Sequence, residues 1–245
     1  ADQRGAVAAK ELRYLTRHPR LRVAWLTSGL LCLAMVVVIG WGDWNYPGLV
    51  LVALAVVFLV TQNSLNQFGW DGPAYWANAV SGADPRGDLV GRNLAALLAG
   101  LLTTAVLTVA LAVVTGGWLY VPVTLCLATG MLGVALGVAD VVSVRFPYPV
   151  PEVTSNLWAV QGTGQGCLVG VMQMLAFTLQ GVLLLPLLVL VGVGLFAWRP
   201  ALAIACPVAV LYGLAVWRVG LGIGARWLRG HQRELLAALS PRRAA

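Results

Sequence analysis

Charged side chains are scarce in this sequence. Asp, Glu, Lys and Arg together make up 10% of the residues, whereas hydrophobic residues make up 60%. In soluble domains about a quarter of all residues are charged, because the surfaces of these domains face water. The composition therefore excludes a soluble globular domain and indicates a protein that lives in a membrane.

Residues that carry covalent or metal chemistry are also few. The only two histidines, His18 and His231, lie in basic segments outside the apolar stretches, and no HExxH motif occurs. The cysteines are widely spaced at positions typical of small buried hydrophobic side chains: Cys32, Cys126, Cys167 and Cys206. An intramembrane enzyme needs a nucleophile and base, paired carboxylates or a metal cluster. The sequence disfavours that reading, and we expect no catalytic residue, bound cofactor or metal in this chain.

A phosphate-binding loop is missing as well. The glycine-rich segment 161–166 lacks the lysine that would make it a Walker motif. The 245 residues leave no room for a soluble ATPase domain beside a membrane domain. The first residue is Ala1 rather than Met, which we interpret as a trimmed start or as the second part of a longer polypeptide.

The sequence does contain long apolar stretches separated by short polar joints. A helix of about 20 residues crosses a hydrocarbon core of roughly 30 Å. Unbroken runs of this length favour helices, which satisfy their own backbone groups in lipid. We therefore predict an all-α membrane domain over 23–225 with six spans, near 23–40, 47–66, 91–115, 119–142, 166–194 and 200–222.

The basic residues lie on alternate joints. They cluster before the first span, between the second and third, and after the fourth and sixth, whereas Arg199 is the only one on the other side. Because Lys and Arg stay on the cytoplasmic side of short loops, both termini are predicted to be cytoplasmic in a multi-pass cell-membrane protein. The basic residues flank membrane spans, so we attribute them to lipid anchoring and predict no nucleic-acid partner.

Both terminal segments are basic and amphipathic. Within the cytoplasmic segment 1–22, residues 3–18 are predicted to form a surface helix that carries Lys10, Arg13 and Arg17 and ends at Pro19. This helix is either a membrane anchor or an element that also receives force from a cytosolic partner. The tail 226–245 is predicted to lie along the inner surface.

The joint between the second and third spans predicts a short cytoplasmic helix near 71–82. Asp71 is expected to cap it, Gly72 and Pro73 to form its first turn and Gly82 to close it. We expect exposed aromatic side chains there, at Tyr75 and Trp76, which form docking surfaces or contact the membrane surface. The next turn then starts at Asp84, Pro85 and Arg86.

Several polar side chains lie in or near the spans. A run at the end of the second span lines an inner vestibule or marks the interface: Gln62, Asn63 and Asn66. Gln173 and Gln180 share a face of the fifth span and either line a path or bond a neighbouring helix. Asp140 is expected to pair with Arg145 or to sit in water at the interface.

Three motifs in register with the spans resemble one known family. The segments are Lys10–Leu15 with 17–20, Asn66–Ala74, and the proline-rich joint Ser143–Pro151. They are similar to the start, the joint after the second span and the joint after the fourth span of ABC-2 type transporter permeases, particularly those of actinobacteria. The resemblance covers nearly the whole chain.

This resemblance implies a type V exporter fold. In that family, six helices form half of the translocation unit, an elbow helix precedes the first span, and a coupling helix docks onto a separate ATP-binding subunit. By position, Asp71, Gly72, Pro73, Tyr75, Trp76, Pro85 and Arg86 would form the coupling region. ATP and Mg²⁺ would be bound by the partner ATPase, and a second six-helix half would complete the path.

The resulting prediction is a permease subunit that exports a lipophilic or drug-like substrate. The short joint between the fifth and sixth spans departs from the larger outer region common in the family. The alternatives are an ATP-independent secondary transporter and a structural membrane subunit. A secondary transporter would be expected to carry charges within the spans and inverted repeats.

Overall fold

The computed structural model describes residues 2–17, 19–41, 47–148 and 166–239. All regular elements in these ranges are helical, as the composition predicted. They are α1 (Gln3–Arg17), α2 (Pro19–Trp41), α3 (Pro47–Ser64), the 3₁₀ turn η1 (Gly72–Tyr75), α4 (Trp76–Val80), α5 (Pro85–Thr115), α6 (Tyr120–Arg145), α7 (Gly166–Phe196) and α8 (Ala201–Leu239). The predicted joints at 42–46 and 149–165 and the end of the tail at 240–245 lie outside the described residues.

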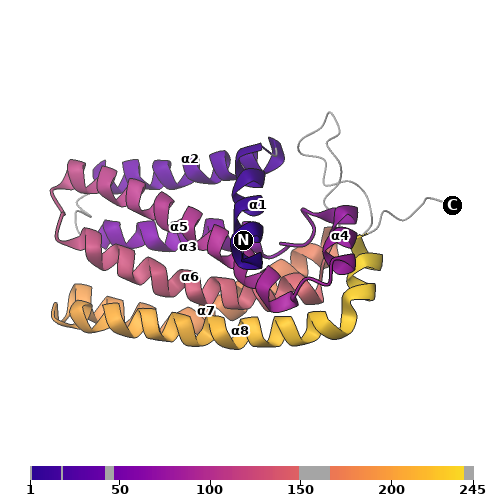
Figure 1. Cartoon of the computed structure of the whole chain (residues 1–245). Helices are drawn as coiled ribbons and strands as arrows, with labels where there is room; N and C mark the ends of the chain where they lie inside the picture. The colour runs from indigo at the N-terminus through magenta and orange to yellow at the C-terminus, as the bar shows by residue number, and fades with distance from the viewer. Residues whose placement is uncertain (1, 18, 42–46, 149–165, 240–245) are drawn as a thin grey trace.

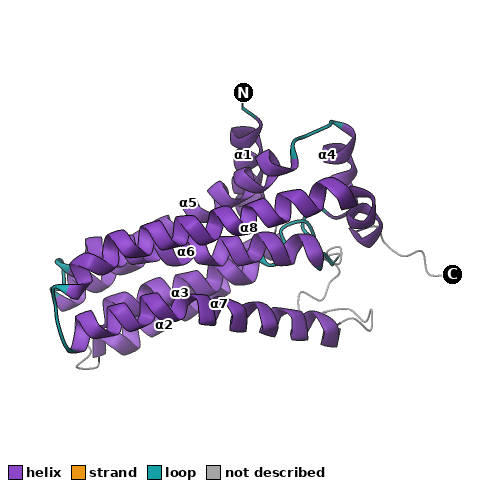
Figure 2. Ribbon diagram, turned by 90° about the horizontal axis from the view of Figure 1, so that it is seen from below, coloured by secondary structure: helices purple, strands orange, loops and turns teal. Residues whose placement is uncertain are grey.

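The long helices α2, α3, α5, α6, α7 and α8 run side by side along a common direction (Figure 1). Seen from below, α2, α3 and α7 lie beside α5, α6 and α8 (Figure 2). The short helices α1 and α4 lie at one end of this bundle, and α1 runs across the long helices (Figure 1). We call this end, where the last turns of α8 also lie, the α1 end.

Four of the long helices, α5, α6, α7 and α8, are long and apolar enough to cross a membrane, counting only the described residues. The apolar stretch of α3 is shorter, from Leu49 to Ser64. The 23 residues of α2 extend about 35 Å at roughly 1.5 Å per residue. These lengths support a multi-pass membrane protein, while the count of six spans stays a prediction.

Helix α6 lies at the centre of the bundle. Its side chains from Leu127 to Val144 are largely buried, and they share a core with α3, α5, α7 and α8. The outward faces of the surrounding helices instead expose large apolar side chains, such as Leu102, Val189 and Leu211. Exposed apolar surface of this extent fits contact with lipid tails rather than with water.

Helices α6 and α8 contact each other backbone to backbone through glycines. A Cβ added to Gly130 would lie 2.2 Å from the carbonyl oxygen of Ala209, and one added to Gly220 would lie 2.1 Å from that of Gly137. The paired positions advance together along both chains, so the two helices are parallel. Small residues let membrane helices approach this closely, where van der Waals contact replaces the hydrophobic effect as the main attraction.

Local sequence signals fix the ends of α5 as predicted. Asp84 caps the helix by accepting a hydrogen bond from the Gly87 amide at 3.0 Å, and Pro85 occupies its first turn. Gly82 has φ of +67°, a left-handed conformation that suits a glycine after the short α4. At the other end, Gly116 closes α5 with φ of +72°.

The described part of the tail is helical. Residues from 226 to Leu239 continue α8, and the helix bends at His231, where φ is −126°. Leu228, Leu235 and Leu239 are buried against Phe68 and other apolar side chains of the protein. These leucines therefore pack onto the protein itself, while the position of the tail at the inner membrane surface stays a prediction.

Candidate functional site

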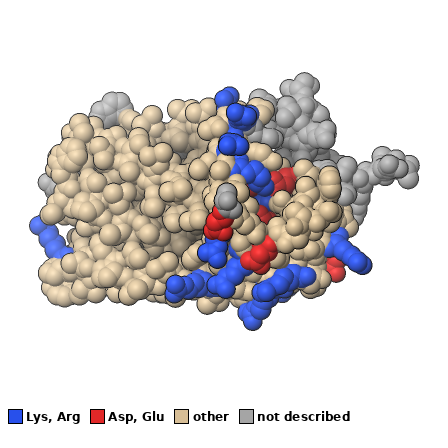
Figure 3. Space-filling view, viewed as in Figure 1, with Lys and Arg blue, Asp and Glu red and all other residues tan. Residues whose placement is uncertain are grey.

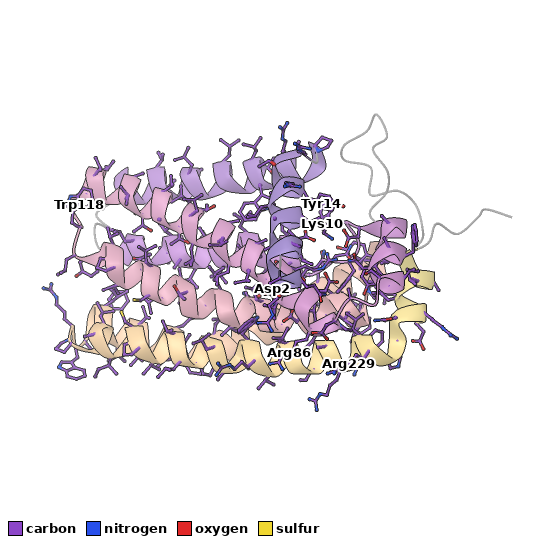
Figure 4. All side chains as sticks on the ribbon, viewed as in Figure 1. Asp2, Lys10, Tyr14, Arg86, Trp118 and Arg229 are labelled. Carbon is purple, nitrogen blue, oxygen red and sulfur yellow. The ribbon has the colours of Figure 1, made fainter. Side chains whose placement is uncertain are left out.

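The exposed face of α4 is the first part of the candidate site. Trp76 is 59% exposed and Val80 is 76% exposed. Residues four apart lie on one face of a helix, so these two side chains form a small apolar surface at the α1 end. Arg86 is also exposed and lies at this end, whereas Trp118 lies at the opposite end of the bundle (Figure 4).

Tyr75 does not belong to this surface. It is only 3% exposed, and its ring lies edge-on to Phe68 with centroids 5.2 Å apart. Burial also raises the pKa of Tyr75. The expectation of two exposed aromatic residues is right for Trp76 and wrong for Tyr75, because Tyr75 closes the 3₁₀ turn and points into the protein.

Asp71 also has a different role from the predicted helix cap. Its carboxylate accepts hydrogen bonds from Lys10 Nζ at 2.9 and 3.0 Å and pairs with Arg92. The first turn is held instead by backbone bonds, including that from the Ala74 amide to the Asp71 carbonyl at 3.0 Å. Gly72 has φ of +51° there, a conformation that glycine adopts without steric cost. Asp71 therefore connects the turn η1 to α1 and α5.

Arg92 is the centre of a buried set of charges, which we call the Arg92 cluster: Lys10, Glu11, Asp71, Asp88 and Arg92. The Arg92 side chain is 2% exposed. It donates to Glu11 Oε1 at 3.0 Å, to the Gln67 carbonyl at 2.9 Å and to Asp88 Oδ1 at 3.3 Å, besides its pair with Asp71. Its guanidinium carbon lies 4.5 Å from the centre of the Phe68 ring. One side chain thus joins α1, the turn after α3 and the first turns of α5.

The pKa values of two acidic groups in the cluster, Asp71 and Glu11, shift in opposite directions. Burial alone would raise the pKa of Asp71, but the nearby cations Arg92 and Lys10 together lower it by more. The pKa of Asp71 therefore lies below its ordinary value. Burial raises the pKa of Glu11, and the same two cations offset only part of that rise. Of these two carboxylates, Asp71 is therefore held more firmly in its charged form.

Helix α1 is fastened to the protein at two further points. The Gln3 amide exchanges hydrogen bonds of 3.0 and 3.2 Å with the backbone of Asp84. Val7 lies directly over Gly91, where an added Cβ would be 2.6 Å from Val7 Cβ. Arg13 and Arg17 remain exposed, whereas Lys10 turns inward to Asp71. Lys and Arg gather around this end on the visible face (Figure 3).

A second polar chain runs from the Arg92 cluster into the bundle. The fully buried Asp140 accepts hydrogen bonds from Asn93 Nδ2 at 3.0 and 2.8 Å, and Asn93 Oδ1 accepts one from Gln67 Nε2 at 3.2 Å. Arg145 is exposed and lies over Trp227 instead. The expected pair of Asp140 with Arg145 is therefore wrong, and so is the expectation that Asp140 sits in water.

The predicted path residues divide into three groups. Asn66 is buried and exchanges hydrogen bonds with the backbone of Tyr148, and Gln173 donates to the Tyr148 hydroxyl at 3.2 Å. Gln180 is buried, and its Oε1 has no partner among the described residues. Gln62 is exposed, whereas Asn63 bonds its own helix at the Leu59 carbonyl. Of these five residues, Asn66 and Gln173 meet through Tyr148.

The central role of Arg92 and the partner of Asp140 were not predicted from the sequence. Arg92 stands beside Asn93 in the sequence, and Asn66 and Gln67 stand side by side after α3. Two pairs of adjacent polar residues at the edges of two apolar stretches are a signal that buried polar groups meet there, since such groups need partners in a membrane.

No family model, curated protein or solved structure matches this chain.

Proposed function

We propose that this chain is the membrane-spanning permease subunit of an ATP-driven transporter. Its six long helices would form half of a translocation path in the cell membrane, with the α1 end and both termini in the cytoplasm. A separate ATPase would bind and hydrolyse ATP with Mg²⁺, and a second six-helix half would complete the path. The resemblance to ABC-2 type permeases and the distribution of basic residues support this proposal.

The observation that carries it is the exposed apolar face of α4 on a firmly held base. Trp76 and Val80 face outward. Directly behind them, Tyr75 packs on Phe68, and Phe68 packs on the buried Arg92. An exposed tryptophan on a short, rigid element is typical of a docking residue, because little conformational entropy is lost when it is buried by a partner.

The base of α4 would carry a displacement into the helices. A push on α4 acts on Asp71, which pairs with both Lys10 and Arg92. Those contacts connect α4 to α1 and α5, and the Asn93–Asp140 bonds connect α5 to α6. Closure of the ATPase would then favour one arrangement of the two halves over another, which is the energetic requirement for a switch. In this scheme α1 is the elbow helix.

The proposal is tested by isolating the tagged chain from its native membranes in mild detergent and identifying the proteins that accompany it. We expect an ATP-binding subunit, and we expect Trp76→Ala to reduce its recovery. Trp118→Ala is the matched control, because Trp118 is similarly exposed but lies at the opposite end of the bundle. Tyr75→Ala is unsuitable, because it removes a buried ring and lowers stability. Equal recovery with both tryptophan variants would refute docking at α4, and recovery of the intact chain without an ATPase would refute the proposed motor.

A secondary transporter is the second candidate, and one observation favours it. Asp140 is fully buried in the bundle, and Asn93 is its hydrogen-bond partner among the described residues. Ionisable residues within a membrane often mark proton or ion pathways. Transport that is driven by a proton gradient without an ATPase, and that is lost in Asp140→Asn, would support this candidate. A structural subunit would show neither form of transport.

The substrate of the permease is proposed to be lipophilic or drug-like, and the direction to be export. The direction follows from the resemblance, and the lipophilic substrate from the apolar character of the spans. The apolar faces of the long helices are compatible with such a substrate, although the same faces also suit lipid.

A further inference from the structure

A cavity of about 260 Å³ lies at the α1 end between α6, α7 and α8, away from the exposed face of α4. Most of its wall is apolar and includes Val142, Phe146, Leu168 and Met172. Leu65 forms its inner limit and packs against buried side chains of α6 and α7. The cavity therefore borders the packed core through Leu65.

The mouth of the cavity is apolar. Leu168 and Phe146 are both about half exposed. Lipid-exposed apolar side chains at an opening favour a ligand that arrives from the bilayer over one that arrives from water. The first turns of α7 thus present an apolar path between lipid and the cavity.

One cation stands at this apolar pocket. Arg145 lines the cavity and is exposed, and its guanidinium carbon lies 6.0 Å from the centre of the Trp227 ring. Among the described residues, no carboxylate forms a salt bridge with Arg145, and none lines the cavity. A guanidinium without an acidic neighbour binds carboxylate or phosphate groups well, because its N–H groups match their paired oxygens.

The polar wall beside Arg145 is held in place by several hydrogen bonds. Tyr148 receives one from Gln173 at its hydroxyl, and its backbone exchanges two with Asn66. Burial raises the pKa of Tyr148, so its hydroxyl stays neutral. The pocket thus combines a fixed polar wall, one cation and a larger apolar wall, as binding sites for small amphiphilic ligands do.

We propose that this cavity binds a single-chain anionic amphiphile from the adjacent lipid leaflet. The acyl chain would lie against Met172 and Leu168, and the anionic group would face Arg145. The cavity volume equals about nine water molecules at roughly 30 Å³ each, which accommodates part of one chain rather than two chains. This site goes beyond the proposed transport function, because ligand binding there requires only that the protein is embedded in a membrane, and it requires no ATPase.

The experiment uses the purified chain in nanodiscs of phosphatidylcholine, with radiolabelled palmitate as the probe and empty nanodiscs as the background. We expect saturable binding above the background. Arg145→Gln should weaken palmitate binding about tenfold, the loss expected for one charge-assisted hydrogen bond. Arg145→Lys should restore most of it. Palmityl alcohol has the same chain without the charge, so its weaker binding should not change in Arg145→Gln.

Arg226→Gln is the matched control, because it removes an exposed arginine of α8 that does not line the cavity. It should change the affinity less than about twofold, since it alters only the attraction of a basic surface for anions. Equal losses in the Arg145 and Arg226 variants would overturn the site in favour of general surface attraction. Displacement of palmitate by free acetate or inorganic phosphate would overturn the bilayer source and identify a soluble anion.

The position of the acyl chain is tested by variants that fill the pocket. Met172→Trp should remove the saturable binding of both palmitate and palmityl alcohol, and Leu168→Trp at the mouth should do the same if the first variant fails to fold. The elution volume and melting temperature of each variant report whether it folds. Unchanged palmitate binding in a folded Met172→Trp or Leu168→Trp variant would overturn the proposal.

Discussion

Replacing Arg92 with methionine removes the cation that joins α1, the turn after α3 and α5. Among the described residues, Glu11 and Asp71 would then keep only their pairs with Lys10, and Asp88 would lose its one salt bridge. The Arg92 side chain is 2% exposed, so water cannot replace its hydrogen bonds without opening the site. Removing one partner of a buried ion pair costs about 3–5 kcal/mol, because the remaining charges stay buried without compensation. We expect Arg92→Met to lower stability by this amount.

The partner variant Lys10→Met should cost much less. The Lys10 side chain is 29% exposed, and water can solvate the groups it leaves. Ion pairs that are partly exposed contribute about 1 kcal/mol or less. The difference between the two variants therefore measures the effect of burial, since both remove one positive charge that contacts Asp71.

The assay is thermal unfolding of the purified chain in detergent, followed by circular dichroism. For proteins of this size, 1 kcal/mol shifts the midpoint by about 2–4 °C. Arg92→Met should thus lower the midpoint by about 6–20 °C and Lys10→Met by at most about 4 °C. Arg86→Gln, an exposed arginine of the same helix, should leave the midpoint unchanged. Similar small shifts for Arg92→Met and Lys10→Met would refute the reasoning, because they would show that water reaches the cluster.

Two further predictions use the same assay. Gly130→Ala places a methyl group 2.2 Å from the Ala209 oxygen and should lower the midpoint through overpacking worth about 1–3 kcal/mol, whereas Gly222→Ala meets no atom within 4 Å and should leave it unchanged or raise it. Unaltered stability in Gly130→Ala would contradict the close contact of α6 and α8. Because the pKa of Asp71 is lowered in the folded state, its stabilising contribution is present above its ordinary pKa near about 4 and is lost as the pH falls through the lower folded value. Midpoints measured from pH 7 downward should therefore fall less steeply in Asp71→Asn than in the parent chain, and an equal slope would contradict the assignment.

The long helices were readable from the sequence because lipid imposes one simple condition. A crossing helix must be apolar over about 20 residues, so length and composition locate it without knowledge of its neighbours. The ends of α5 were readable for a similar reason, since Asp84 and Pro85 act on the turn in which they stand. The structure extends α8 well beyond its predicted end near residue 222, because apolar content marks only the part of a helix that suits lipid.

The roles of single polar residues could not be predicted from length and composition. Asp71 turns toward Lys10, which is 61 residues away, and Arg92 turns toward Glu11, which is 81 residues away. Such pairs depend on how α1 crosses α5, and local periodicity holds no information on that crossing. Tyr75 and Trp76 are neighbours with opposite environments for the same reason, since the chain behind η1 buries only one of them.

The glycine contact lies between these cases. The spacing of Gly130, Gly133 and Gly137 in α6, and of Gly213, Gly220 and Gly224 in α8, is visible in the sequence. Small residues at such intervals predict close packing of membrane helices. The spacing does not identify the partner helix, and only the structure shows that the two stripes meet.

That contact determines how force applied to the end of α8 would be distributed. The 30 residues of α8 before its bend at His231 extend about 45 Å at roughly 1.5 Å per residue, which exceeds a hydrocarbon core of roughly 30 Å, so part of α8 would lie outside the lipid of a membrane. Two parallel backbones in contact leave no side chains that could yield between them. A torque on the part of α8 outside the lipid would therefore turn α6 with it. The Asn93–Asp140 hydrogen bonds would transmit this rotation to α5. Helices α5, α6 and α8 would then rotate together as one rigid body. This body would slide against α2, α3 and α7.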